Sequence, residues 1–358
     1  MEKLEQTINT FVLLGKFIDQ FLTETHAGDQ RLNEVNQLHY ESFGRLIKDV
    51  QWYNPWFTEE FVLEALRGVR QLIEKEHLEQ WFRNYPELEK RNMPVKSVGV
   101  VMAGNIPLVG FHDFLSTLVT GNRIIIKTSS KDEHLIKAVA EVVKTINPAL
   151  ADKIVFPETP LTGIDAVIAT GSSNTSRYFE YYFRNIPSII RKNRNSIAVL
   201  TGTESDSQLK DLGRDIFTYF GLGCRNVTKL FVPKSYDPSG LLSLYESYNY
   251  LYHHHKYANN IDYYRTIYVM NGIPFLDNGA FLLKEDRGLS GPVGVVYYEK
   301  YSDIEQLRQY VSIQRDQLQC VVSAKPFMEG VIPPGSTQKP LPWDYADGVD
   351  TLRFLIDN

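Results

Sequence analysis

The sequence has few cysteines, no long apolar run and no excess of basic residues. Only Cys224 and Cys320 are cysteines among its 358 residues, which argues against a disulfide framework or a thiolate metal site and predicts a reducing compartment. Lysine and arginine number 38 against 43 aspartates and glutamates, so a surface that binds nucleic acid or anionic lipid is not expected. The most apolar stretch, 98–111, is shorter than the roughly 20 residues of a membrane-spanning helix. Because the opening residues MEKLEQTINT do not look like a signal peptide, we expect a cytoplasmic protein without a membrane span.

Two catalytic signatures are also missing. The chain contains neither the Gly-x-Gly-x-x-Gly dinucleotide fingerprint nor the Gly-x-Ser-x-Gly of serine hydrolases. The run His253–His255 does not predict a metal centre, because three consecutive side chains do not converge on one ion and no other ligand joins them at suitable spacing. We therefore expect no bound metal and a solvated or partly packed histidine run.

Residues 1–92 show the spacing of helices. Between Leu4 and Leu22 the apolar residues recur at helical intervals. Thr58 is placed to cap a further helix, whose buried side would hold Phe61, Val62, Ala65, Leu66, Val69 and Ile73.

From residue 95 onward, apolar β-branched runs alternate with helical patterns. The first group of predicted strands is VKSVGVVM (95–102), RIIIK (123–127), KIVF (153–156) and DAVIAT (165–170). Ser130 and Glu133 have the spacing of a capping box for the helix that follows the second of these strands. Such alternation predicts a parallel sheet with helices on both faces.

A second alternation begins after the strand pattern at 196–200. The predicted helices are 206–220, 238–250 and one that begins with a box of Ser302 and Glu305. The predicted strands are 227–232, 266–270, 280–283, 293–298 and 318–323. The stretch 333–343 is too rich in proline and glycine for regular structure.

Cys224 is the first candidate for chemistry, in FGLGCRN (220–226) between a predicted helix and strand. Two glycines just before it would let a substrate carbonyl approach the sulfur, and Arg225 could favour the thiolate. A lone cysteine is also typical of a small buried hydrophobe. We accept that interpretation for Cys320, which lies in an apolar strand pattern, whereas spacing alone leaves both readings open for Cys224.

Three further segments lie where predicted strands end, which is where ligands bind in parallel sheets. In AGNIPLVG (103–110), Asn105 offers an amide donor suited to an oxyanion, although these are also turn residues. In IKTSS (126–130), Lys127 and the hydroxyls suit a phosphate or ribose, although an exposed lysine beside a capping serine fits equally. In ATGSSNTSR (169–177), glycine and hydroxyls open a helix and form a second candidate phosphate site.

These four segments, in this order, resemble the aldehyde dehydrogenase superfamily, and more closely its LuxC-like branch of acyl-CoA reductases. The likeness covers about residues 95–355, including the closing PPGSTQKPLPWDYADGVDTLRFL. It implies an α/β, aldehyde dehydrogenase-like fold with a Rossmann-like cofactor domain at 93–200, an α/β catalytic domain at 201–345 and a C-terminal tail at 346–358. The helical N-terminal region, 1–92, would pack on the cofactor domain.

The resemblance also implies roles for individual residues. Cys224 matches the catalytic nucleophile and Asn105 the asparagine of the oxyanion hole. Lys127 matches the lysine that holds the adenosine ribose, and Gly171 and Ser172 match the pair that contacts the pyrophosphate. The family further implies a homo-oligomer.

Departures from the family pattern refine this expectation. The segment 190–194 has no carboxylate where aldehyde-oxidising members carry the glutamate that activates water, which disfavours hydrolysis of an acyl-cysteine. The segment 288–292 lacks a second glutamate, the one that contacts the nicotinamide ribose. Ser130 stands where NAD-preferring members often carry a glutamate, and a hydroxyl tolerates a 2′-phosphate better, which favours NADPH over NADH.

The expected function is therefore NADPH-dependent reduction of a long-chain fatty acyl-CoA or acyl-protein thioester to the aldehyde through an S-acyl-cysteine, with an acyl-protein synthetase as a candidate partner. The alternatives are a CoA-acylating aldehyde dehydrogenase working in the oxidative direction, and a cysteine acyltransferase or acyl-binding protein without redox activity. The joint presence of Asn105, Lys127 and Cys224 favours the reductase.

Overall fold

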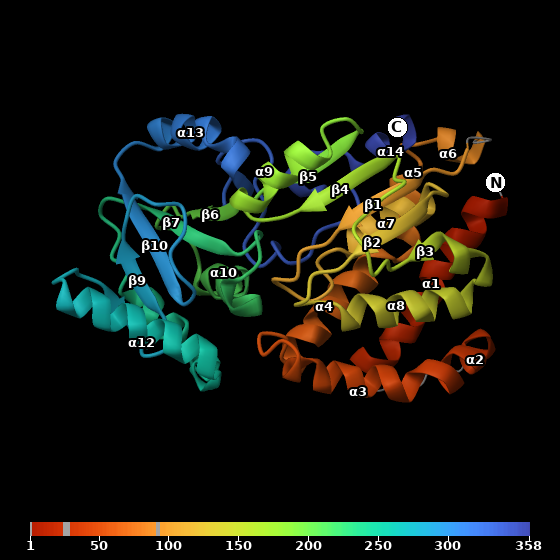
Figure 1. Cartoon of the computed structure of the whole chain (residues 1–358). Coiled ribbons are helices and arrows are strands. Elements are labelled where there is room, and N and C mark those ends of the chain that lie inside the picture. Colours follow the sequence, from red (N-terminus) through yellow and green to blue (C-terminus); the bar gives the residue numbers. More distant parts are fainter. Residues whose placement is uncertain (1, 24–28, 91–93) are drawn as a thin grey trace. The chain divides into compact units, whose positions relative to one another are not determined.

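The computed structural model describes residues 2–23, 29–90 and 94–358 (Figure 1). The chain divides into two compact units, the first made of Met1–Lys192 with Pro340–Asn358 and the second of Asn193–Lys339. None of the helices in the described ranges combines the length and the apolar character that crossing a bilayer requires.

A five-stranded parallel sheet forms the centre of the first unit. Its strands are β1 (Ser97–Val101), β2 (Arg123–Lys127), β3 (Ile154–Val155), β4 (Ala166–Thr170) and β5 (Ser188–Arg191). The spatial order is β3-β2-β1-β4-β5, so the chain runs outward from β1, then returns to place β4 on its other side. The four strands predicted for this region are confirmed, and β5 is an addition.

The N-terminal helices share one hydrophobic core with this sheet. They are α1 (Glu2–Leu22), α2 (Asn33–Val35), α3 (Glu41–Asp49), α4 (Glu59–Leu72), α5 (Lys75–Phe82) and α6 (Glu87–Lys90). The helices between and after the strands are α7 (Phe111–Val119), α8 (His134–Ile146), α9 (Ser173–Tyr182) and α14 (Thr351–Asp357). Phe11 of α1 meets the rings of Phe111 and Phe114 of α7 edge-on, at 6.3 Å between centroids.

The C-terminal segment joins the same unit through partly buried polar groups. The indole N–H of Trp81 donates to the Tyr345 hydroxyl at 2.7 Å, and the Tyr85 hydroxyl donates to Asp350 at 2.7 Å. Residues far apart in the sequence are therefore held by specific hydrogen bonds as well as by apolar packing.

Two of the three predicted helix caps are wrong. Thr58 accepts the backbone N–H of Phe61 and caps α4, as predicted. Ser130 lies in a turn before α8, whose N-cap is Glu133 without a side-chain cap. Asp303, not Ser302, caps α13, because its carboxylate accepts the backbone N–H groups of residues 305 and 306.

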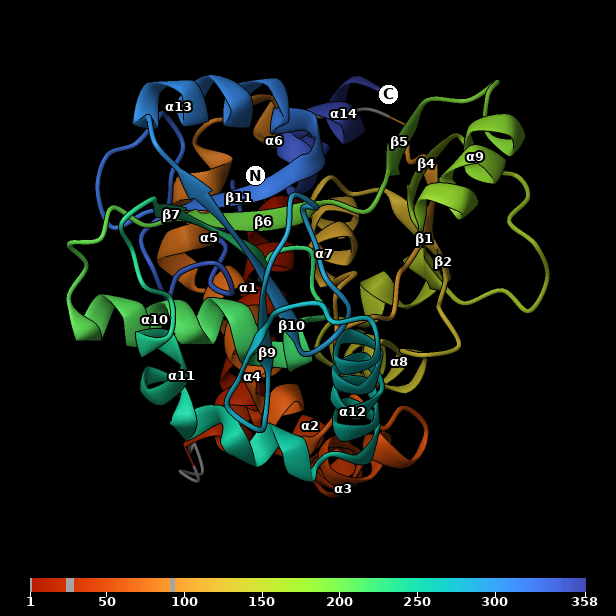
Figure 2. The same cartoon turned by 90° about the vertical axis from the view of Figure 1, so that its left-hand side faces the viewer.

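The second unit contains a six-stranded sheet in the order β11-β6-β7-β10-β9-β8, in which only the β8–β9 pair is antiparallel (Figure 2). Its strands are β6 (Asn195–Val199), β7 (Val227–Pro233), β8 (Leu276–Asp277), β9 (Leu282–Glu285), β10 (Val295–Tyr301) and β11 (Leu318–Val322). Its helices are α10 (Asp206–Phe217), α11 (Gly240–Leu244), α12 (His255–Met270) and α13 (Ile304–Ile313).

The strand predicted at 266–270 is wrong, because these residues form the last turns of α12. Their β-branched and aromatic side chains favour a strand locally, but Tyr257, Ile261 and Tyr268 are the buried positions of a continuous helix. Tertiary burial therefore overrides local propensity. The helix predicted at 238–250 divides into α11 and a 3₁₀ segment, Glu246–His253.

Candidate active site

Five of the six predicted site residues lie in the first unit, at the carboxyl edge of its sheet. Asn105 follows β1, Lys127 ends β2, and Gly171 and Ser172 follow β4. Strand β1 pairs with both of the others, with Val101 opposite Lys127 on one side and Ala169 on the other. The structure therefore brings three segments from separate parts of the sequence to neighbouring strand ends, where doubly wound sheets bind ligands.

The loop that carries Asn105 packs tightly against the loop after β2. A Cβ atom at Gly104 would lie 2.7 Å from the Ser129 hydroxyl and 3.0 Å from the backbone nitrogen of Asp132, so a larger residue does not fit there. Leu108 has a positive φ of 55°, and its N–H donates to the Asp132 carboxylate at 2.7 Å. The side chain of Asn105 itself is exposed.

Asp132 is a residue of this site that sequence reasoning missed. It is 4% exposed, and its second carboxylate oxygen has no hydrogen-bond partner among the described atoms. Burial raises the pKa of Asp132 to about 7, against the opposing effect of the Leu108 N–H. The Asn105 loop therefore rests on a carboxyl group that titrates near neutrality.

The predicted cofactor residues differ in their exposure and in their local structural roles. Lys127 is half-buried and Ser130 is exposed. The Ser172 hydroxyl accepts the Thr175 N–H at 3.2 Å and caps α9, so the helix predicted after this segment is confirmed. A Cβ at Gly171 would lie 3.0 Å from Thr175, so this position brings the backbone close to the first turn of the helix.

Cys224 lies in the second unit, in the loop between α10 and β7, and its side chain is exposed. The helix predicted through residue 220 ends at Phe217, and a 3₁₀ turn of four residues follows it. Cys320 is buried in β11, as expected, and neither cysteine is in a disulfide. The guanidinium of Arg225 donates to the Cys320 sulfur at 3.5 Å, a contact that the sequence did not indicate.

Two other predicted segments adjoin the Cys224 loop. Phe220 and Gly221 line a cavity of about 70 Å³ together with Gly291 and Pro292, so the structure brings the segment 288–292 beside this loop. The ring of His254 lies against the ring of Phe220, tilted by 39° with 4.5 Å between centroids.

His254 also accepts the Tyr257 N–H at the start of α12. The histidine run is partly packed, as predicted, and the described residues contain no cluster arranged to hold a metal ion.

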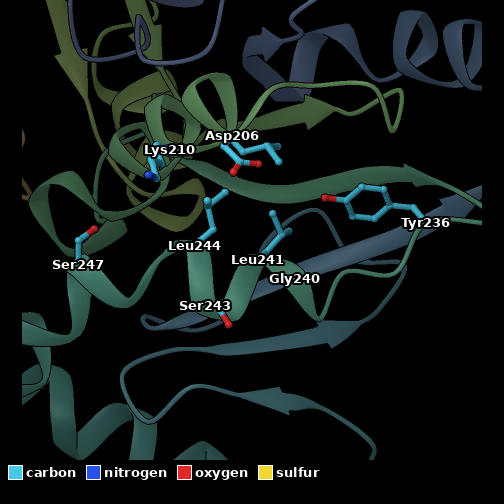
Figure 3. A pocket seen from close by; sticks show the side chains of 9 residues that line it. Asp206, Lys210, Tyr236, Gly240, Leu241, Ser243, Leu244 and Ser247 are labelled. Atoms are coloured by element: carbon cyan, nitrogen blue, oxygen red, sulfur yellow. The ribbon is translucent and has the colours of Figure 1, made fainter.

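A larger cavity, of about 710 Å³, lies between α10 and α11 of the second unit (Figure 3). It is lined by leucines, small polar residues, Asp206, Lys210 and Tyr236. It shares no residue with the predicted site segments.

The segment 190–194 carries an arginine with a structural role. Arg191 of β5 donates to Asp113 of α7 at 2.6 Å and to the Thr351 hydroxyl of α14 at 2.9 Å. Both members of the ion pair are buried. Removal of either partner of a buried ion pair strongly destabilises the folded protein, because the other charge is left buried and unpaired.

A family model described as Acyl-CoA reductase (LuxC) matches residues 13–239, a range that includes every predicted site residue and most of the N-terminal helical region. No protein of curated function matches the chain.

Several solved structures share the fold at low sequence identity. An Anabaena variabilis protein assigned as the aldehyde dehydrogenase PutA gives a TM-score of 0.58 at 15% identity, over 93% of this chain and 79% of that chain. A Mycobacterium tuberculosis aldehyde dehydrogenase complexed with NAD⁺ gives 0.56 at 13%, over 88% and 73%. Aldehyde dehydrogenase 21 from Physcomitrella patens, in complex with succinate, gives 0.57 at 12%, over 88% and 73%. These likenesses confirm the predicted fold class.

Proposed function

Because the chain belongs to the LuxC family of acyl-CoA reductases, we propose that it reduces a fatty acyl thioester to the aldehyde through an acyl group carried on Cys224. The observation that carries this proposal is the placement of an exposed cysteine in a glycine-containing loop between a helix and a strand, within the range that the family model matches. An exposed thiol of this kind is accessible to a thioester, whereas the buried Cys320 is not.

The first chemical step is exchange between thioesters. The Cys224 thiolate attacks the acyl carbon and forms a new C–S bond, and the carbonyl oxygen becomes an oxyanion. The Asn105 amide and the Cys224 backbone N–H are the proposed donors to that oxygen, and loss of one such donor typically costs about 10²–10³ in rate. The C–S bond to the donor thiol then breaks, and that thiol leaves as a thiolate and takes a proton from solvent.

The residues at the sheet edge of the first unit fit a dinucleotide. Gly104 and Gly171 let the loops at the strand ends pack closely against Ser129 and Thr175. The capped start of α9 offers backbone N–H groups to a pyrophosphate, and Lys127 can donate to a ribose hydroxyl. When bound, NADPH supplies the hydride that reduces the acyl carbon. The oxyanion of the resulting thiohemiacetal re-forms the C=O bond as its C–S bond breaks, so the aldehyde is released and Cys224 leaves as the thiolate.

Two observations refine the proposed cofactor and direction. Ser130 is exposed on the loop after Lys127 and adds no negative charge, which supports NADPH, with NADH as the alternative donor. The guanidinium of Arg191 in the segment 190–194 is committed to Asp113, and no carboxylate in that segment could activate water against an acyl-cysteine. This supports reduction in preference to hydrolysis.

The donor and the assembly are also part of the proposal. We take acyl-CoA or an acyl-protein thioester as the donor, with an acyl-protein synthetase as a candidate partner, and we expect a homo-oligomer. Helix α9 carries three exposed tyrosines, at positions 178, 181 and 182. Tyrosine is enriched at protein interfaces, which supports association through this helix.

The test is intact-mass analysis after mixing the protein with acyl-CoA in the absence of cofactor. We expect one acyl adduct on the wild-type chain and on Cys320→Ala, the matched control, and none on Cys224→Ala. An equal adduct on Cys224→Ala, or none on wild type, would contradict the proposal. Aldehyde formation with NADPH and with NADH then separates a reductase from an acyltransferase, which would form the adduct but no aldehyde.

A further inference from the structure

The backbone just before Cys224 adopts a conformation that side chains disfavour. Tyr219, Phe220 and Gly221 all have positive φ angles, of 55°, 57° and 74°. Two of these residues are aromatic and buried, although this region of conformational space favours glycine. Strain of this kind persists only where surrounding contacts impose it, and it is concentrated at functional sites.

The side chain of Asn226 holds this strained turn in place through its hydrogen bonds. Asn226 is 0% exposed and satisfies main-chain groups on both sides of the strained turn. Its amide nitrogen donates to the carbonyls of Asp215 and Thr218 at 3.0 and 2.9 Å, and its amide oxygen accepts the Gly223 N–H at 2.8 Å. One asparagine therefore ties the last turn of α10 to the residue that precedes the cysteine.

The backbone of Asn226 orients the peptide group between residues 223 and 224. The Asn226 N–H donates to the Gly223 carbonyl at 3.0 Å. The carbonyl and the N–H of a trans peptide point in opposite directions, so fixing the Gly223 oxygen also fixes the direction of the Cys224 N–H. That N–H is the backbone donor that the proposed function assigns to the oxyanion.

Ser196 holds the peptide group on the other side of Cys224. Its hydroxyl donates to the Cys224 carbonyl at 2.9 Å and accepts the Cys320 N–H at 3.1 Å. Ser196 is 0% exposed and lies in β6, between β7 and β11. The peptide group before Cys224 is therefore fixed by the Asn226 backbone, whose buried side chain holds the preceding turn, and the peptide group after it by the buried Ser196 hydroxyl.

We propose that Asn226 and Ser196 are positioning residues that set the Cys224 backbone N–H in place as an oxyanion donor for acyl transfer. This inference rests on the proposed function, because it assigns a task in that reaction. Both side chains are 0% exposed and so act through the backbone of the loop. Their contribution is to hold the donor still before the oxyanion forms, and a misplacement of about 1 Å costs up to about 10²-fold in rate.

Two rates measured on the same variants separate positioning from simple stability. Acylation by a thioester passes through an oxyanion, whereas alkylation of the thiol by iodoacetamide does not. We expect Asn226→Ala to lower kcat for acyl transfer about 10²-fold with KM for acyl-CoA nearly unchanged. Ser196→Ala, which removes one oxygen atom, is expected to lower kcat about 10-fold. For both variants, the alkylation rate should stay within a few-fold of wild type.

Asn278→Ala is the matched control. Asn278 organises a turn in the same unit by accepting the N–H groups of Ala280 and Phe281, both at 3.0 Å, and its loss should leave kcat unchanged. If Asn226→Ala does not fold, Ser196→Ala carries the test alone.

The outcomes distinguish this inference from the function on which it rests. If the wild-type chain is acylated and both variants are acylated equally fast, the positioning roles are overturned and the proposed function stands. A parallel fall of acylation and alkylation also overturns them, since it indicates general damage to the loop. Absence of acylation on the wild-type chain would instead refute the proposed function itself.

Discussion

The buried carboxyl group of Asp132 makes the stability of the first unit depend on pH near neutrality. Burial raises its pKa from 3.8 to about 7. The folded chain therefore binds this proton more tightly than the unfolded chain, so the contribution of Asp132 to stability is largest below pH 4, falls as pH rises from about 4 to about 7, and then levels off. Each pKa unit corresponds to about 1.4 kcal/mol, so the total loss is about 4 kcal/mol.

The substitution Asp132→Asn removes this titration and keeps the shape of the side chain. The amide oxygen can still accept the Leu108 N–H, which the carboxylate now accepts at 2.7 Å. The new amide nitrogen lies where the second carboxylate oxygen has no partner, which costs about 1–3 kcal/mol at every pH. The absolute stability of the variant is therefore less informative than its change with pH. Relative to wild type, the variant should gain about 4 kcal/mol between pH 4 and pH 8.

Urea unfolding followed by tryptophan fluorescence measures the stability of the first unit. All four tryptophans, at positions 52, 56, 81 and 343, belong to the first unit, so the signal does not report on residues 193–339. Glu133→Gln is the matched control. Lys137 lowers the pKa of the half-exposed Glu133 carboxyl group. The small contribution of Glu133 to stability is therefore lost as pH falls, whereas that of Asp132 is lost as pH rises. Parallel stability curves for wild type and Asp132→Asn between pH 5 and pH 8 would refute the reasoning.

Three further predictions concern other contacts. Tyr345→Phe leaves the buried indole N–H of Trp81 without its acceptor and should lower the unfolding free energy of the first unit by about 1–3 kcal/mol in the same urea assay, whereas an unchanged midpoint would contradict this. Asp215→Ala removes the buried carboxylate that accepts both the N–H and the hydroxyl of Thr337, so hydrogen exchange at that amide should become at least about 10-fold faster, and unchanged protection would show that other contacts hold the loop. Lys127→Met should raise KM for NADPH without slowing acylation of Cys224 in the absence of cofactor. Acylation slowed by the same factor as KM for NADPH is raised would contradict a role of Lys127 in cofactor binding alone.

Much of the fold follows from local patterns that have one physical interpretation. Strand β2 is the segment 123–127 predicted from its apolar β-branched run, because a strand buried on both faces leaves no polar alternation. The helix that follows Thr58 is equally clear, since a cap and an apolar face coincide. The segment 266–270 fails because its composition favours a strand while its burial continues a helix, and only the tertiary structure decides between them.

The candidate site was predictable where a residue carries its own chemistry. Cys224 and Asn105 stand out by side-chain type and by the glycines beside them. Asp132 and Ser196 do not, because their roles arise from contacts with Leu108 and Cys224, 24 and 28 residues away. Only the folded chain shows that these ordinary polar residues hold the site loops.

The central claim is that the acyl group on Cys224 lies on the path to the aldehyde. The most direct measurement is a single-turnover experiment in which the acyl-enzyme is formed, separated from excess acyl-CoA and then mixed with NADPH. The account predicts that the acyl adduct disappears from the intact mass as an equal amount of aldehyde appears. An adduct that persists in the presence of NADPH, or one that is released as the free acid, would contradict it.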